Sequence, residues 1–136
     1  MKLIVDTNII LSSLIKEGLN RRIIVTDSLR FYTLNYVIME TRKYMDYIIE
    51  KSGITKNEAE ILLSLFMENI TILSDEEIRS KISEAKEIMK NIDINDAPIL
   101  ACALAIRNDG IWTEDRHFEK QRKVRIWHSK DLLAYV

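Results

Sequence analysis

The chain has 136 residues, of which 47% are hydrophobic and 30% charged, with only three glycines, one proline, one cysteine and two histidines. The glycines lie too far apart to form a dinucleotide-binding or P-loop glycine motif. One cysteine and two histidines exclude disulfide frameworks, cysteine-rich zinc sites and the HExxH helix of metalloproteases. Carboxylates, hydroxyls or amides must therefore do most of any chemistry that the protein performs.

Length and charge also indicate the general class of the protein. Single domains most often have about 100–150 residues, so we expect one domain over residues 1–136. The net charge of −1 argues against nucleic-acid binding by bulk positive charge. The first apolar run, Leu3–Val5, is too short for a signal peptide, and no uncharged run reaches the roughly 18 apolar residues of a membrane span. We expect a cytoplasmic protein with a reduced cysteine.

In the first half of the chain, strand-like segments alternate with helix-like ones. Continuous apolar runs indicate strands buried on both faces, and polar capping residues mark the helix starts. In chain order we expect a strand at Leu3–Val5, a helix at Ile9–Lys16 capped by Thr7 or Asn8, a strand at Phe31–Leu34, a helix capped by Asn35 that ends near Gly53, a helix opened by a capping box at Thr55–Glu58, and a strand at Thr71–Leu73.

Two of these helices carry more apolar side chains than one buried stripe requires. The expected stripes are Val37, Thr41, Tyr44 and Ile48 in the first, and Ala59, Leu62, Phe66 and Ile70 in the second. The apolar residues off these stripes are Ile38, Met39, Met45, Ile49, Leu63, Leu65 and Met67. A large exposed apolar surface usually marks an interface, so we expect a homodimer.

The second half continues the alternation. A capping box at Ser74–Glu77 opens a helix, and Asn95–Pro98 opens another whose apolar character all round predicts the most buried helix. After a turn at Asp109–Gly110, we expect strands at Ile111–Thr113 and Lys123–Trp127 and a last short helix at Ser129–Tyr135. Strands that alternate with helices predict a three-layer α/β/α sandwich with a central parallel sheet.

Four carboxylates are expected at one edge of that sheet. Asp6 directly follows the first strand, Asp96 opens the buried helix, and Asp115 follows the fourth strand, while Glu40 lies about one turn into the helix after the second. Ligands of parallel sheets bind beyond the carboxyl ends of the strands. Two unit charges about 4 Å apart repel by roughly 4 kcal/mol at an effective dielectric near 20. A hard cation, Mg²⁺ or Mn²⁺, would neutralise this oxygen-only cluster and support phosphodiester hydrolysis.

Four segments of the chain resemble the four acidic signatures of PIN-domain nucleases. They are Leu3–Ile9, Leu34–Glu40, Asn95–Leu104 and Trp112–Phe118. The resemblance spans essentially the whole chain and implies a PIN-like fold. It also implies a Mg²⁺- or Mn²⁺-dependent endoribonuclease that cuts single-stranded RNA, with Asp6, Glu40, Asp96 and Asp115 as the metal-binding and catalytic acids and Asn8 and Thr113 as the polar residues that orient them.

The resemblance also implies partners for the protein. Many small bacterial and archaeal members of this family are toxins that a small antitoxin protein neutralises, and members commonly dimerise. The Ala97-Pro98 pair after the third acid is not the commonest sequence at this place among those toxins. A different class of function, a catalytically silent RNA-binding or scaffold protein of the same fold, would show no metal binding.

Two of the acids have neighbours that could replace them as ligands. Asp93 lies three residues before Asp96, and Glu114 is adjacent to Asp115. Asp96 is preferred because it directly precedes the apolar helix. Asp115 is preferred because the family pattern places its acid after a Thr-x pair.

A basic segment follows the fourth acid. It contains Arg116, Lys120, Arg122, Lys123 and Arg125, with Glu119 as its only acid. Such a segment is either a solvated charged face or a track for an RNA backbone, formed here by Arg116, Arg122, Lys123 and Arg125. For the remaining notable residues we expect a structural role, with Cys102, Trp112 and Trp127 in the core. His117 and His128 are expected at the surface or with satisfied hydrogen bonds, and neither is expected to be a metal ligand.

Overall fold

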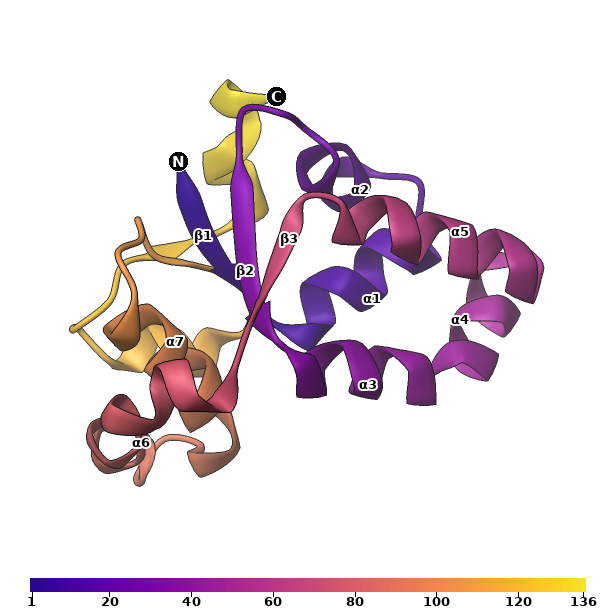
Figure 1. The fold of residues 1–136 in the computed structure, drawn as a ribbon. Coiled ribbons are helices and arrows are strands. Elements are labelled where there is room, and N and C mark those ends of the chain that lie inside the picture. Colours follow the sequence, from indigo (N-terminus) through magenta and orange to yellow (C-terminus); the bar gives the residue numbers. More distant parts are fainter.

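Five short parallel strands form the central sheet of the structure, a computed structural model that describes residues 1–136 (Figure 1). The strands are β1 (Lys2–Val5), β2 (Arg30–Leu34), β3 (Ile70–Leu73), β4 (Ile111–Trp112) and β5 (Ile126–Trp127). Their order across the sheet is β3-β2-β1-β4-β5, and every neighbouring pair is parallel. The order reverses at β1, so a crevice is expected beyond the carboxyl ends of β1 and β4.

Helices cover both faces of the sheet (Figure 1). They are α1 (Thr7–Ile15), α2 (Leu19–Ile24), α3 (Asn35–Lys43), α4 (Met45–Ser52), α5 (Lys56–Met67), α6 (Asp75–Met89) and α7 (Ala97–Ala105), with short 3₁₀ helices η1 (Ile94–Asp96), η2 (Arg116–Lys120) and η3 (Ser129–Tyr135). On one face α7 packs on β1 and β2, and α6 packs on α7; on the other, α2, α3, α4 and α5 pack around α1. The predicted α/β fold with a parallel sheet between helices is confirmed.

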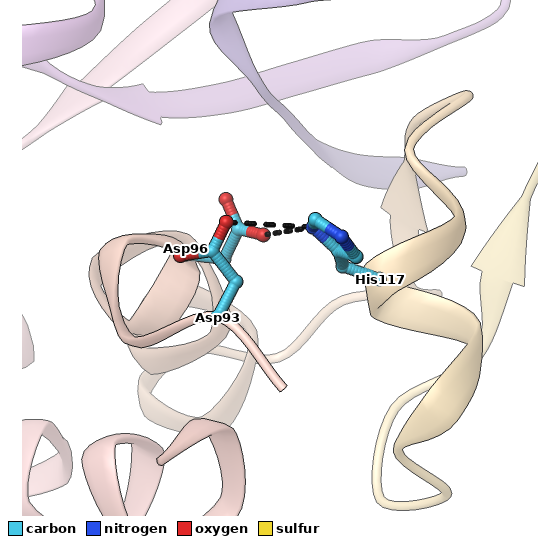
Figure 2. A group of neighbouring side chains, drawn as sticks. All are labelled: Asp93, Asp96 and His117. Atoms are coloured by element: carbon cyan, nitrogen blue, oxygen red, sulfur yellow. Dashed lines mark ion pairs between the residues drawn. The ribbon is translucent and has the colours of Figure 1, made fainter. Parts of the chain in front are cut away.

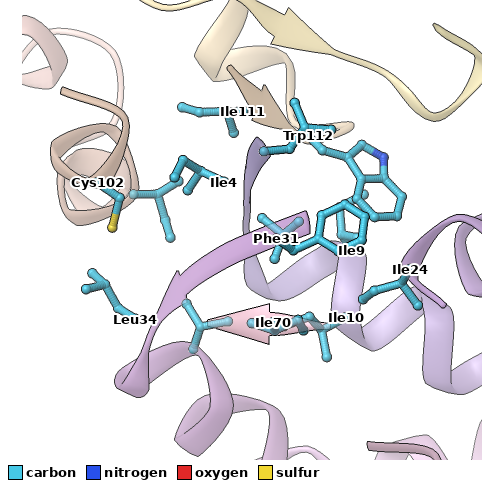
Figure 3. Close-up of a cluster of buried hydrophobic side chains, with 14 of the residues drawn as sticks. Ile4, Ile9, Ile10, Ile24, Phe31, Leu34, Ile70, Cys102, Ile111 and Trp112 are labelled. Atoms are coloured by element: carbon cyan, nitrogen blue, oxygen red, sulfur yellow. The ribbon is translucent and has the colours of Figure 1, made fainter. Parts of the chain in front are cut away.

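A single cluster of 33 buried hydrophobic residues fills the interior. The rings of Phe31 and Trp112 lie 5.3 Å apart, between centroids, at its centre (Figure 3). Helix α7 is buried over most of its length, as its apolar composition predicted, and Cys102 has no exposed surface. Burial raises the pKa of the Cys102 thiol to about 12. The predicted core positions of Cys102, Trp112 and Trp127 are confirmed.

The expected long helix after β2 is broken at Tyr44. Its two parts, α3 and α4, pack on different portions of α1, and this break shifts the phase of the apolar stripe. Tyr44, expected to be buried, is therefore 47% exposed, whereas Ile38 and Met45, expected off the stripe, are buried. In α5 the same expectation was wrong for Leu63, which is fully buried.

Several helix ends differ from the sequence expectation. Asp6, rather than Thr7 or Asn8, caps α1 with its side chain, and Asn35 is the first residue of α3 rather than its cap. Ile70 begins β3 instead of extending α5. Other differences are the unexpected helix α2, the shorter strands β4 and β5, and the 3₁₀ geometry of η3. No helix of this fold combines the length and the apolar character that crossing a membrane requires.

Candidate metal centre

The structure brings the four sequence-predicted acids together in one pocket. It has a volume of about 170 Å³ and is lined by Asp6, Glu40, Asp96 and Asp115, together with Thr7, Asn8, Tyr36, Asn95 and Ile99. These acids come from four separate segments: the start of α1, the middle of α3, the junction of η1 with α7, and the residue before η2. The pocket lies at the carboxyl-end edge of β1 and β4, where the reversal of strand order predicts a binding site.

Asp6 is the most deeply buried of these acids, with only 7% of its surface exposed. One carboxylate oxygen, Oδ1, accepts a hydrogen bond from the Ile9 backbone N–H at 3.1 Å, and Oδ2 accepts one from the Thr113 hydroxyl. Burial raises the Asp6 pKa to about 6, and the nearby Asp115 charge adds to the rise, although both hydrogen bonds oppose it. The Asp6 carboxylate is thus held in place, but the two hydrogen bonds compensate its negative charge only in part.

Thr113 connects two of the acids. Its hydroxyl donates to Asp6, and the same oxygen accepts the backbone N–H of Asp115 at 3.0 Å. This is the orienting role that the family resemblance implied for Thr113. Asn8, the other implied orienting residue, lines the pocket but makes no hydrogen bond to an acid.

Negative charge accumulates around Asp96. Burial, and after it the charges of Asp115, Asp93 and Asp6, raise the pKa of this carboxyl to about 6. The pKa of Tyr36, at the wall of the pocket, is also raised, first by burial and then by the charge of Glu40. The protein's own side chains therefore do not balance the charge of this pocket.

Asp93 and His117 extend the acidic cluster on one side (Figure 2). His117 Nδ1 lies 3.4 Å from Asp93 Oδ2, 3.8 Å from Asp96 Oδ2 and 3.4 Å from Asp115 Oδ1. One ligand atom each from Asp93, Asp96 and His117 lie within 4.8 Å of one another, the spacing of a metal-binding group. Asp93 thus joins Asp96 instead of replacing it.

His117 was expected to be a surface or satisfied residue and not a ligand, so its position among the acids was not predicted. The signal that could have found it is local: His117 lies two residues after Asp115, and its backbone N–H donates to Asp115 Oδ1 at 2.9 Å. That turn aims the imidazole back toward the acids.

Two atoms of the cluster test whether a cation fits. Asp96 Oδ2 and His117 Nδ1 are shielded from solvent, and neither has a hydrogen-bond partner. Leaving a buried acceptor unsatisfied costs about 1–3 kcal/mol, and such groups call for an explanation such as a bound ion. Carboxylate oxygens suit Mg²⁺ and Mn²⁺. The residues present therefore fit a divalent cation.

Glu114 belongs to a different pocket. Its Oε1 accepts the Ser129 backbone N–H at 2.7 Å, and its Oε2 lies 3.5 Å from His128 Nδ1. This second pocket, of about 560 Å³, is lined by Glu114, Arg116, Glu119, His128, Ser129 and Lys130. Of the two neighbouring acids after β4, Asp115 is the one that faces the acidic pocket.

The basic segment after Asp115 does not line the acidic pocket. Arg116 lies at the Glu114 pocket, whereas Lys123 and Arg125 line a third hollow with Gly110, at the amino ends of β4 and β5. The Arg125 guanidinium lies 3.7 Å from the centroid of the Trp127 ring. Arg122 is exposed. The expected basic residues are therefore distributed over separate surfaces, because the chain runs back to the amino end of the sheet before β5 begins.

The fold and the pocket together define an α/β protein with an acidic, cation-compatible site at the point where its strand order reverses. A family model described as "PIN domain" matches residues 4–136. The chain therefore belongs to the PIN-domain family, whose members are typically metal-dependent nucleases. No curated protein matches the chain.

Proposed function

We propose that this protein is a divalent-metal-dependent endoribonuclease that hydrolyses phosphodiester bonds of single-stranded RNA. The observation that carries the proposal is the convergence of Asp6, Glu40, Asp96 and Asp115 in one pocket, with too little positive charge beside them. Such a carboxylate cluster is suited to Mg²⁺ or Mn²⁺. The choice of RNA as substrate rests on the resemblance of the four acidic segments to those of PIN-domain nucleases.

The residues of the pocket have distinct roles in this reaction. A divalent cation would supply positive charge to the attacked phosphate and lower the pKa of a water molecule. Asp6, Glu40, Asp96 and Asp115 would hold it. Thr113 fixes the Asp6 carboxylate through Oδ2 and the Asp115 backbone through its N–H. These acids lie on helices or directly next to them, and sites built on regular elements are held more precisely than sites on loops.

The test is RNA cleavage by wild-type protein and by Asp6→Asn. We expect Mg²⁺- or Mn²⁺-dependent cleavage of single-stranded RNA by the wild type, its loss on chelation, and its loss in Asp6→Asn. Circular dichroism should show that the variant keeps its fold. Glu87→Gln, at an exposed residue of α6 that does not line the pocket, is the control and should cleave normally.

Three results would contradict the proposal. Cleavage that persists in Asp6→Asn would contradict the site, and cleavage of single-stranded DNA alone would contradict the substrate. A wild-type protein that binds RNA without binding metal would instead be the catalytically silent protein of the same fold.

We further propose that the protein acts as the toxin of a toxin–antitoxin pair and forms a homodimer. Support for a dimer comes from exposed large apolar side chains on α3, α4 and α5, namely Tyr36, Met39, Tyr44, Tyr47, Ile61 and Leu65. Exposed apolar surface of this kind favours an interface. A monomeric mass in solution at micromolar concentration would contradict the dimer, and a neighbouring reading frame that encodes no small protein would count against an antitoxin.

A further inference from the structure

We propose that His117 is a nitrogen ligand of the metal centre and that it makes the site bind Mn²⁺ in preference to Mg²⁺. This inference rests on the proposed metal site, and adds to it a ligand that the four-acid pattern does not contain. It is carried by the position of one atom, His117 Nδ1, among three carboxylates. Figure 2 shows two of them, Asp93 and Asp96; the third is Asp115.

The distances around that atom suit shared coordination. Nδ1 lies 3.4 Å from oxygens of Asp93 and Asp115 and 3.8 Å from Asp96 Oδ2. Adjacent ligands of an octahedral ion with bonds of about 2.1 Å are about 3 Å apart. A small inward movement of these side chains would therefore bring nitrogen and oxygen to the distances of one coordination shell.

The ring is positioned for this role and has no other partner at Nδ1. The His117 backbone N–H is held by Asp115 Oδ1 at 2.9 Å, and Asp93 is held through its Oδ1 by the Asn95 N–H at 3.0 Å. Nδ1 itself and the facing Asp96 Oδ2 are shielded from solvent without hydrogen-bond partners. Two buried, unpartnered atoms that face each other call for an explanation, and an ion bound between them is one.

The chemistry of imidazole sets the preference. Mg²⁺ is a hard ion that binds oxygen and keeps several waters. Divalent first-row transition-metal ions accept imidazole nitrogen more readily, although Mn²⁺ does so least among them. Nitrogen among the ligands therefore shifts the preference from Mg²⁺ toward Mn²⁺, and an all-carboxylate pocket would discriminate less between the two ions.

The experiment is electron spin-echo envelope modulation of Mn²⁺ bound to the whole chain without a purification tag. The chain has only two histidines, so a signal from imidazole nitrogen has only two sources. We expect modulation from an imidazole nitrogen in the wild type, its loss in His117→Gln, and its retention in His128→Gln. His128 is the matched control because both of its ring nitrogens already have partners, Thr113 O and Glu119 Oε1.

A binding competition gives a second measurement. In His117→Gln the ratio of the Mg²⁺ to the Mn²⁺ dissociation constant should fall by about tenfold, the lower end of the effect of lost metal-site interactions. Circular dichroism controls for folding.

The outcomes separate this inference from the proposed function. Wild-type protein that binds Mn²⁺ without imidazole modulation, or His117→Gln that retains it, would overturn the His117 ligand while RNA cleavage and its loss in Asp6→Asn could still stand. Absence of any Mn²⁺ binding would overturn this inference, and absence of both Mn²⁺ and Mg²⁺ binding would overturn the metal site as well.

Discussion

Two clusters of one histidine and several carboxylates lie on either side of the segment after β4. One contains His117 with Asp93, Asp96 and Asp115, and the other contains His128 with Glu114 and Glu119. The two clusters differ in how completely their polar atoms are hydrogen-bonded. Around His128, both ring nitrogens have partners and Glu114 accepts a backbone N–H. Around His117, the ring Nδ1 and Asp96 Oδ2 are buried without hydrogen-bond partners. Composition alone would not separate the two, so pairing is what distinguishes a structural cluster from a candidate ligand site.

The ionisation of the two clusters differs in the same way. Burial opposes the charged form of His128, but the hydrogen bond to Glu119 and the charge of Glu114 outweigh it, so that the His128 pKa is raised. That cluster balances its own charge. In the other cluster, burial and like charges raise the pKa values of Asp6 and Asp96 to about 6. Such an acidic cluster is stable at neutral pH when a cation compensates it.

The largest expected effect on RNA cleavage is seen when one carboxylate of the His117 cluster is exchanged for an amide and the same exchange is made in the His128 cluster for comparison. Asp96→Asn should lower kcat/KM for single-stranded RNA by at least about 100-fold and weaken Mn²⁺ binding, because metal-site interactions are worth factors of this order. Glu114→Gln should change both little, since its side chain lies in the other pocket. Steady-state kinetics and calorimetry measure this pair of variants. Equal losses in the two variants would remove the distinction between the clusters.

A second prediction concerns Thr113, which touches both clusters. Thr113→Val removes the donor to Asp6 and the acceptor for the Asp115 N–H, and leaves both groups unpaired. The free energy of unfolding should fall by about 1–3 kcal/mol, and metal affinity should fall with it. Urea denaturation with and without Mg²⁺ gives both quantities. Thr71→Val, at an exposed strand position, is the control and should be nearly neutral.

A third prediction concerns the pH dependence of the metal-free protein. Since the folded-state pKa of Asp6 is about 6 rather than 3.8, the folded state binds more protons, and stability falls as pH rises through this interval. For this buried group the loss is up to about 3 kcal/mol. The raised His128 pKa acts in a higher pH window: its contribution to stability is complete below the ordinary histidine pKa of 6.5 and is lost as pH rises through the folded-state pKa.

Thermal unfolding in EDTA and in Mg²⁺ from pH 4 to pH 9 separates these two contributions. Added Mg²⁺ should abolish the first decline, because the ion stabilises the ionised acids, and should leave the second unchanged. If the stability of Asp6→Asn declined over the lower pH interval as much as that of the wild type, this decline could not be assigned to Asp6.

The smallest expected effect is at Glu119. Glu119→Gln removes the charge that pairs with His128 at the surface, where such pairs contribute about 0.2–1 kcal/mol. The His128 pKa should fall, as an NMR titration would measure, while metal binding is unaffected. A change in Mn²⁺ affinity would instead show that the two clusters are coupled.

The order of the strands and of most helices along the chain could be predicted because local sequence patterns determine it, whereas helix α2 was not expected. A continuous apolar run followed by an acid predicted β1 and Asp6, and the apolar run after Pro98 predicted the buried helix. The choice of Asp115 over Glu114 as the site residue could also be predicted, because the side chains of adjacent residues in an extended chain point to opposite sides. Asp115 therefore shares a side with Thr113.

Other features could not be predicted because they depend on contacts distant in sequence. No glycine or proline marks the break at Tyr44, where packing of α3 and α4 on α1 interrupts a regular period. The environment of His117 includes Asp93 and Asp96, which lie more than twenty residues earlier in the chain. The sequence around His117 therefore does not distinguish it from a surface histidine, because the acids reach it only when η1 and η2 pack together.

The hydrogen bond between Thr113 and Asp6 joins residues 107 positions apart. Strand β1 is made first but is completed as the centre of the sheet only when β4 pairs with it. Pairings of such long range form late and slowly, because the entropy of closing the loop must be overcome first. A growing chain therefore carries the first two acids of the pocket, Asp6 and Glu40, through most of its synthesis, and the complete pocket cannot form until Asp115 has been synthesised and β4 has paired with β1.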